Sequence, residues 1–394
     1  MGKNMAATFK PRDLDEVPSV DALLVELGTG PFVRETLTAP VGRNDSWVGT
    51  TTSGRKVFVK HLIGPGPDVR ARLDRLLSFE RLAESLPTTA LRGPAFLGTD
   101  EANSLVAYDY VEDARSGAEL MIDQTFGPEL AENIGRAIGL LHEAPLTSAP
   151  QLDESLPPHP PQGFLRGLPL PVFESLSFAE LQGWRLMQTD EALIAAIGRL
   201  REREREAPRV PSHCDLRVDQ FLIRDDDFLV TDWEEFRSAD PARDVGAFAG
   251  EWLHRSILDI VTTRGDSEFL DLELTHEVVL SRGVQKMQRL LPLVRSFWHG
   301  YRQVRPRLDD ELATRATAYA GWHMLDRLMA GASRTSRLSG IERAAAGIGR
   351  AALINPGNFV TTLGFEEREE PVEKRPGLPG TPEGVRPDER EAAA

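Results

Sequence analysis

The chain has 394 residues, 41% of them hydrophobic and 27% charged, which suits a globular protein of one large domain or of two to three ordinary ones. Its formal net charge of −15 disfavours binding to nucleic acid or to anionic membranes, because both require positive charge on the protein. A single cysteine, Cys214, excludes an internal disulfide, and the lack of a bilayer-length apolar run or signal-peptide core favours a cytoplasmic protein.

The first 111 residues predict a strand-rich unit. Two strands are expected within residues 46–62, separated by a turn at residues 52–54. A helix is expected over residues 68–86, because its apolar side chains recur at helical spacing and a proline follows. Residues 104–111 form another β-rich run and lead into a connector.

The remaining chain is predicted to be mainly helical, with helices over residues 128–144 and 178–206 and a helix-rich stretch over 245–354. Residues 145–171 contain too many prolines for regular structure, whereas 221–223 and 228–230 predict a small β hairpin. We therefore predict an α+β fold of two lobes. The predicted parts are an N-terminal extension (1–24), a β-rich N-lobe ending in a hinge (25–111), a helical C-lobe (112–365) and a disordered acidic tail (366–394).

The strongest chemical signal is the segment from His213 to Gln220, which is followed 12 residues later by Asp232. Phosphoryl transfer from ATP requires a carboxylate that accepts a proton, oxygen ligands that hold magnesium on the phosphates, and a rigid loop that aligns them. Asp215, Gln220 and Asp232 provide these groups, and the hairpin between them brings loop and second aspartate side by side. The pattern predicts a kinase that uses ATP and Mg²⁺.

At these residues the chain resembles the aminoglycoside phosphotransferase and choline kinase group of the protein-kinase-like fold. That family shows His-Gly-Asp, an Asn five residues after the Asp, then Asp-Trp or Asp-Phe, and finally Asp-Pro-x-x-Asp, which is matched here by residues 240–244. The resemblance implies these roles: catalytic base, Asp215; main magnesium ligand, Asp232; second metal position, Gln220; loop bracing, His213 and Asp244; contact with the transferring phosphoryl group, Arg217.

Two residues depart from the family pattern. Cys214 replaces the usual glycine and is interpreted as a small buried residue without nucleophilic function. Gln220 replaces the usual asparagine, and its side chain is one methylene longer. We therefore expect altered geometry at the second metal position.

A kinase N-lobe also needs a lysine on the phosphates and a glutamate that holds this lysine. Lys60 ends a predicted strand and is the candidate lysine. Glu80 on the following helix is its expected ion-pair partner, and Glu84 lies one turn later as an alternative.

The turn over the phosphates and the adenine contact are assigned less directly. Residues 44–49 contain one glycine, Gly49, and do not form a G-x-G-x-x-G loop. At the hinge, backbone groups of Asp109 and Val111 are expected to meet adenine.

The N-lobe segments 44–49, 57–62 and 72–80, together with the loop 213–215, resemble the kinase component of class V lanthipeptide synthetases. This resemblance implies phosphorylation of Ser or Thr in a ribosomally made precursor peptide, after which a separate lyase eliminates phosphate. A cyclase is a further expected partner, and nothing in this chain resembles either enzyme.

Two alternatives remain at this point. One is a small-molecule O-phosphotransferase of the antibiotic-resistance type, which for an aminoglycoside would require a cleft lined by carboxylates. The other is a pseudokinase that binds a peptide or partner without chemistry, an interpretation favoured by Gln220 and by the poor phosphate turn.

Overall fold

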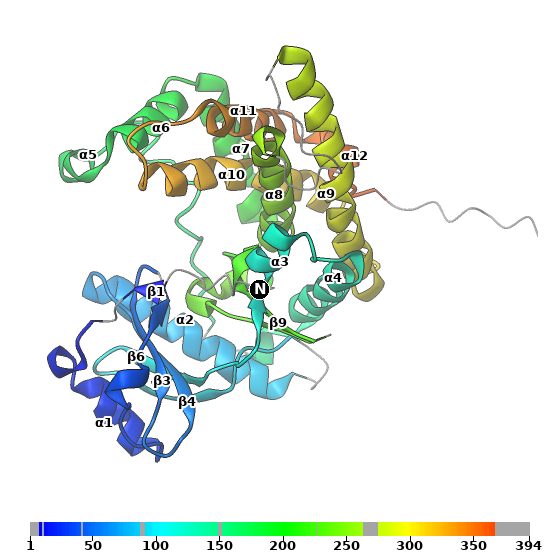
Figure 1. Cartoon of the computed structure of the whole chain (residues 1–394). Helices are drawn as coiled ribbons and strands as arrows, with labels where there is room; N and C mark the ends of the chain where they lie inside the picture. Colours follow the sequence, from blue (N-terminus) through cyan, green and yellow to red (C-terminus); the bar gives the residue numbers. More distant parts are fainter. Residues whose placement is uncertain are drawn as a thin grey trace, which may run out of the picture.

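The computed structural model describes residues 8–9, 12–40, 42–86, 91–148, 152–225, 227–262 and 275–366. Two lobes are visible in Figure 1, one built around a β-sheet and one almost entirely helical. The predicted α+β class is confirmed. In the described part of the chain, no helix combines the length and apolar character required to cross a membrane.

The N-lobe is organised by an antiparallel four-stranded sheet in the order β3-β4-β6-β5. Its strands are β3 (Asp45–Thr50), β4 (Lys56–His61), β5 (Phe96–Asp100) and β6 (Leu105–Asp109). Two helices cover its faces, α1 (Ser19–Glu26) and α2 (Gly66–Ser85). The predicted strand pair, its turn and the helix after it are therefore confirmed.

The alternation of side chains along β4 determines the face of the sheet to which the Lys60 side chain points. Val57 and Val59 are fully buried in the cluster that includes residues of α1, because successive side chains of a strand point to opposite faces. Phe58 packs on the other face, in the cluster that includes residues of α2. Lys60 follows Phe58 at the same parity and thus points to the α2 side of the sheet.

The N-lobe begins earlier in the chain than predicted. Leu14, Val20 and Leu24 are buried in one core with Trp47 of β3. This stretch includes η1 (Leu14–Glu16) and α1, and it completes the sheet's core because the face bearing Val57 and Val59 would otherwise be exposed. The proposed separate extension over residues 1–24 is therefore wrong for the part from Leu14 onward.

Short strands frame the site between the lobes. β7 (Arg115–Ser116), β9 (Phe221–Arg224) and β10 (Asp227–Val230) form one sheet, which contains the predicted hairpin. β8 (Val210–Ser212) pairs with β11 (Arg237–Ala239). The short elements β1 (Thr8–Phe9), β2 (Ala39–Pro40) and η2 (Arg34–Thr36) adjoin the N-lobe sheet's edge.

The helical lobe is made of α-helices with short 3₁₀ turns between them. The described helices are α3 (Gly117–Asp123), α4 (Pro128–Glu143), α5 (Leu170–Ser175), α6 (Phe178–Gln188), α7 (Glu191–Glu206), α8 (Ala242–Leu258), α9 (His276–Val304), α10 (Leu312–Ala332), α11 (Gly340–Ile354) and α12 (Val360–Leu363). The 3₁₀ turns are η3 (Leu146–Ser148), η4 (Val218–Gln220), η5 (Trp233–Glu235), η6 (Asp259–Val261) and η7 (Pro356–Asn358).

The single helix predicted over residues 178–206 is divided in the structure. α6 ends at Gln188 and α7 starts at Glu191. The side chain of Asp190 accepts a hydrogen bond from the amide of Leu193, so it caps a new helix. The predicted disordered tail lies almost wholly outside the described residues, and Phe365 just before it is buried against Trp298.

Glycines allow the helices of this lobe to contact one another through their backbones. A methyl group on Gly135 of α4 would collide with the carbonyl of Phe297 in α9, and one on Gly300 of α9 would collide with the carbonyl of Glu132. This crossing holds α4 and α9 rigidly together, next to the loop that carries Asp215.

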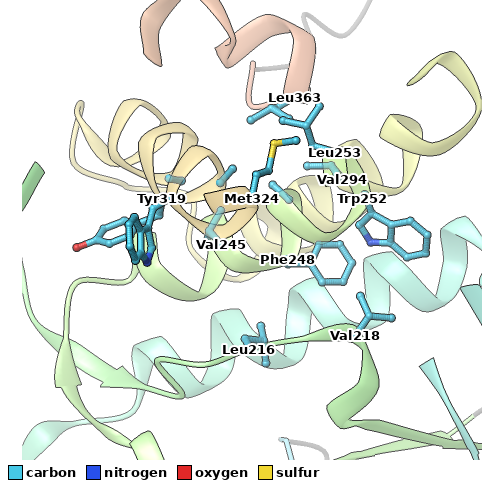
Figure 2. Packing of buried hydrophobic residues seen from close by; sticks show 14 of the residues in the cluster. Leu216, Val218, Val245, Phe248, Trp252, Leu253, Val294, Tyr319, Met324 and Leu363 are labelled. Carbon is cyan, nitrogen blue, oxygen red and sulfur yellow. The ribbon is translucent and has the colours of Figure 1, made fainter. Parts of the chain in front are cut away.

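The predicted catalytic segment is anchored in the helical core. Leu216 and Val218 are fully buried, and Figure 2 shows them below α8, with Val218 near Phe248. Phe248 itself stacks on Phe297 with ring centroids 4.2 Å apart. Because alternate residues enter the core, Asp215 and Arg217 are directed away from it, toward the space between the lobes.

Candidate active site

The backbone of the predicted catalytic loop is held by Asp244, at the start of α8. Its two carboxylate oxygens accept hydrogen bonds from the amides of His213 (2.8 Å) and Cys214 (2.7 Å). Cys214 has a φ of 67°, in the left-handed region, which costs a non-glycine residue about 1 kcal/mol. This conformation explains the family's glycine, and Asp244 lies where the resemblance implied.

Buried side chains in the interior of the helical lobe hold Asp244 in place. His142 of α4 contacts its carboxylate at 3.1 Å, and the other ring nitrogen of His142 lies 2.9 Å from the hydroxyl of Tyr301. Burial alone would raise the pKa of Asp244, but its bond to His142 and the charge nearby lower it. Asp244 is therefore an ionised anchor, and His142 supports the loop from within the lobe.

Asp215 lies on the loop between His213 and η4, with Arg217 beside it. Burial raises the pKa of Asp215, and the charge of Arg217 opposes this shift. Arg217 Nε is 3.6 Å from Asp215, and Arg217 Nη2 is 3.9 Å from Asp232. Among the described residues Arg217 Nε has no hydrogen-bond partner, so the guanidinium lies between these carboxylates without being tied to them.

His213 braces the loop, as the resemblance implied. Its Nε2 lies 3.0 Å from the carbonyl of Thr231, just before Asp232, and its Nδ1 accepts a hydrogen bond from the amide of Asp215. A single side chain thereby connects the two segments that carry the aspartates.

Gln220 lies at the site, but its amide oxygen is already used. Oε1 accepts a hydrogen bond from the amide of Arg217 at 3.0 Å, while Nε2 is 3.4 Å from Asp215 Oδ2. The longer side chain reaches back to cap its own turn. Its role as second metal ligand stays a prediction and requires this side chain to rearrange.

Asp232 and Lys60 meet across the boundary between the lobes. Lys60 Nζ donates to Asp232 Oδ1 at 2.6 Å. Burial alone would raise the pKa of Asp232, but the charges of Lys60 and Arg217 lower it to about 2. The structure thus brings together Lys60, His213, Asp215, Arg217, Gln220 and Asp232.

Glu80 is not the partner of Lys60 in this structure. The hydroxyl of Tyr108 donates to Glu80 at 3.2 Å, and burial raises the pKa of Glu80 to about 7. Within the described parts of the chain, the carboxylates paired with Lys60 are Asp232 and Glu234. The expected pair of Lys60 and Glu80 is therefore wrong for this conformation.

Glu234 is the site residue that sequence reasoning missed. It stands two residues after Asp232 and contacts Lys60, Arg72 and Asn44. The sequence signal that could have identified Glu234 as a site residue was its position directly after Asp232-Trp233. The tryptophan stacks on Phe79 of α2 with centroids 3.5 Å apart, which brings this turn against the N-lobe.

Gly49 does not lie over the site. It is the second-last residue of β3, opposite Val57, and a Cβ there would meet Phe32 and Leu37. It therefore occupies the sheet face opposite Lys60, and the predicted phosphate turn over residues 44–49 is wrong beyond its first residue. The segment that reaches the site is the connection at residues 42–44, through Asn44.

The predicted adenine contacts lie at the end of β6. The amide of Asp109 donates to the carbonyl of Ala95, and its carboxylate is bound by Arg55. Its amide is thus already engaged, whereas Val111 belongs to the connector between the lobes. Their contact with adenine remains a prediction.

The donor atoms at the site suit magnesium only in company with a nucleotide. Asp232 is an ionised carboxylate, and carboxylate and amide oxygens are hard ligands of the kind Mg²⁺ prefers. The described residues contain no group of three or more His, Cys, Asp or Glu that could hold a metal ion alone. Mg²⁺ in proteins is usually held by one or two carboxylates together with substrate phosphates.

Two lobes that present a sheet lysine and an aspartate loop to one another define a phosphotransferase of the protein-kinase-like fold. Residues 42–271, more than half of the chain, match the phosphotransferase enzyme family, and the chain belongs to this family.

Solved structures to which this chain is similar share little sequence with it. A spectinomycin phosphotransferase in complex with ADP and spectinomycin is 14% identical over 90% of this chain and 98% of its own, with a TM-score of 0.47. A choline/ethanolamine kinase family protein from Mesorhizobium loti is 15% identical over 89% and 99%, with a TM-score of 0.46. An amicoumacin kinase in complex with AMP-PNP and Ca²⁺ is 13% identical over 87% and 96%, with a TM-score of 0.47. The comparison with curated proteins gave no match.

Proposed function

We propose that this phosphotransferase moves the γ-phosphoryl group of ATP, with Mg²⁺, to a hydroxyl group of its acceptor. The observation that carries the proposal is the meeting of Lys60 from one lobe with Asp232 from the other at 2.6 Å, beside Asp215 and Arg217. A nucleotide bound between the lobes would thereby meet cations for its phosphates and a carboxylate for its metal.

The chain's own residues account for the transfer step. Asp215 accepts the proton of the acceptor hydroxyl, and the hydroxyl oxygen of the acceptor bonds to the γ-phosphorus of ATP. The bond between the γ-phosphorus and the bridging oxygen of the β-phosphate breaks at the same time, so that ADP leaves. Arg217 balances charge on the moving group, because it lies near the carboxylates without a hydrogen bond that would have to be given up. Bound Mg²⁺, held through Asp232, would supply further charge neutralisation on the phosphates.

For the acceptor, we propose Ser and Thr hydroxyls of a ribosomally made precursor peptide, with a separate lyase and cyclase as partners. The resemblance to class V lanthipeptide kinases motivates this acceptor. The charges near Asp215 support it over a polycationic acceptor. Glu251 of α8 is paired with His323 at 2.6 Å, and Asp326 of α10 with Arg327 at 2.7 Å.

These pairings matter because an aminoglycoside would need carboxylates that are not already engaged by partners within the protein. Burial would raise the pKa of Glu251, yet His323 and Arg327 lower it to about 2. Arg327 also acts on Asp215 and opposes the rise of its pKa. Glu251 and Asp326 are thus already engaged by partners within the protein, which supports a neutral hydroxyl-bearing acceptor over a polycation.

A small-molecule acceptor remains the second candidate, because a spectinomycin phosphotransferase and an amicoumacin kinase share the fold. A pseudokinase is disfavoured, since a pure scaffold has no need for Lys60, Asp215, Arg217 and Asp232 around one space.

The test is transfer of labelled phosphate from ATP with Mg²⁺, offering Ser/Thr-containing precursor peptides and an aminoglycoside panel side by side. Label on a peptide that disappears with Asp215→Ala would establish the peptide kinase. Label only on a small molecule would reject the peptide acceptor. No transfer to either, with ATP still bound, would support the pseudokinase.

A further inference from the structure

The carboxylate of Glu234 collects contacts from three separate N-lobe segments. Oε1 is paired with Lys60 of β4 and accepts a hydrogen bond from Asn44 Nδ2 at 2.7 Å. Oε2 accepts a hydrogen bond from Nη1 of Arg72 of α2 at 2.9 Å. Glu234 itself belongs to the turn η5 and is 7% exposed, so this cross-lobe contact is shielded from water.

Arg72 and Asn44 fix the orientation of this carboxylate. Arg72 is fully buried, and its Nη2 donates to the carbonyl of Ile63 at 2.5 Å. Asn44 Oδ1 accepts hydrogen bonds from Arg72 Nη1 and from the amide of Ile63, each at 3.1 Å. Because both oxygens of Glu234 have fixed partners, Lys60 is presented with a carboxylate that cannot swing away.

Glu80 lacks these properties. Its one described hydrogen bond comes from Tyr108, and burial raises its pKa to about 7. A carboxyl group that is only about half ionised near pH 7 is a weaker counter-ion for an ammonium group than a fully ionised one.

We propose that Glu234, and not Glu80, is the carboxylate that positions Lys60 for the phosphates of ATP, and that it also tethers residues 42–44 beside them. The proposal rests on the proposed function, because it presumes that ATP binds between the lobes. Two carboxylates share Lys60, so a nucleotide that engages Asp232 leaves Lys60 held by Glu234. Glu234 is a positioning residue, since it acts through Lys60 and Asn44.

Calorimetric binding of a non-hydrolysable ATP analogue with Mg²⁺ tests this assignment without relying on activity. We expect Glu234→Gln to weaken binding by about 10- to 100-fold, the worth of one or two charge-assisted hydrogen bonds. Glu80→Gln should change it less than about threefold. The matched control is Glu235→Gln in the same turn, because Glu235 faces Arg75 and Arg237 instead of Lys60.

Steady-state kinetics give a second readout on the transferring enzyme. Loss of lysine positioning should raise KM for ATP more than it lowers kcat. A smaller fraction of folded enzyme would instead lower the apparent kcat alone, and thermal unfolding of each variant detects such a loss of folded protein. If Glu234→Gln does not fold, Asn44→Ala, which removes the tether together with the bonds that Asn44 accepts from Arg72 and Ile63 but keeps the carboxylate, should still weaken analogue binding, by about three- to tenfold.

A double-mutant cycle with Lys60→Met isolates the interaction. In the Lys60→Met background, Glu234→Gln should weaken the remaining binding much less than it does in the wild type. The proposal would be overturned if Glu234→Gln weakened analogue binding as much in the Lys60→Met background as in the wild type. It would also be overturned if Glu80→Gln weakened analogue binding more than Glu234→Gln does. A wild-type protein that does not bind the analogue would instead refute the proposed function.

Discussion

The two sides of the site are held by different forces. On the helical side, Asp244 is fully buried and contacts His142, which in turn contacts Tyr301, and these two residues come from helices whose backbones touch. On the sheet side, Lys60 is held by carboxylates that belong to the other lobe. The predicted catalytic loop therefore depends on packing within one lobe, whereas the position of Lys60 depends on charge across two.

This difference predicts different sensitivities. Volume changes should damage the helical side, because close-packed helices cannot adjust to added atoms. Charge changes should act first on the sheet side, where Lys60, Arg72 and Glu234 compensate one another with little exposure to water. Each prediction below tests one side.

The largest effect is expected at Asp215 and Asp232, the two aspartates that the helical lobe presents to the space between the lobes. Asp215→Ala should lower turnover by roughly 10²- to 10⁴-fold, the usual contribution of a general base, and leave ATP binding largely intact. Asp232→Asn should instead abolish magnesium-dependent nucleotide binding, because it removes the ionised carboxylate. Turnover assays and calorimetric measurement of nucleotide binding separate the two results. Wild-type turnover in both variants would show that the assignment of Asp215 and Asp232 to the active site is wrong.

The anchor of the loop comes next. Asp244→Asn replaces one accepting oxygen by an NH₂ group that faces a backbone amide of His213 or Cys214. Leaving such a donor unpaired in a fully buried position costs about 1 to 3 kcal/mol, so the melting temperature should fall together with kcat. A fall in kcat without any loss of stability would show that Asp244 does more than hold the loop.

Gly135→Ala tests the packing on the helical side directly. The added methyl group collides with the backbone of α9, so we expect a loss of about 1 to 3 kcal/mol in the free energy of unfolding by denaturant titration. Gly347→Ala is the control, because Gly347 is exposed on α11 and a Cβ there meets no atom within 4 Å. That substitution should stabilise slightly.

The fold was predictable where local pattern decides it. The strands around Lys60, the helix that follows and the hairpin after Gln220 all have clear periodicity or turn residues, and the structure contains them. The break at Asp190 was missed because a run of helix formers continues past it, although an aspartate at that position can cap a new helix.

The partner of Lys60 was beyond the reach of local pattern. Arg72 and Glu80 lie eight residues, or about 12 Å, apart along α2, and the sequence does not say which turn of the helix faces Lys60. Gly49 shows the same limit, because alternation puts it on one face of β3 but the sequence does not say which face meets the nucleotide. Both errors concern contacts between distant segments, which tertiary packing decides.

Glu80→Gln is expected to have the smallest effect on nucleotide binding, and its effect on stability tests whether the pKa of Glu80 is raised in the folded protein. The folded pKa of Glu80 is about 7, above its ordinary value of 4.5. As pH rises from 4.5 to 7 the unfolded chain releases this proton before the folded one, so wild-type stability falls over that window. Gln does not titrate, so the variant should gain stability relative to wild type between pH 5 and pH 8, by up to about 3 kcal/mol. Thermal unfolding of the nucleotide-free protein at pH 5 and at pH 8 measures this gain in stability. The control is Glu84→Gln, because Glu84 lies at an exposed position one turn later on α2. An equal difference between variant and wild type at the two pH values would mean that Glu80 is charged when folded, and would restore it as a candidate partner for Lys60.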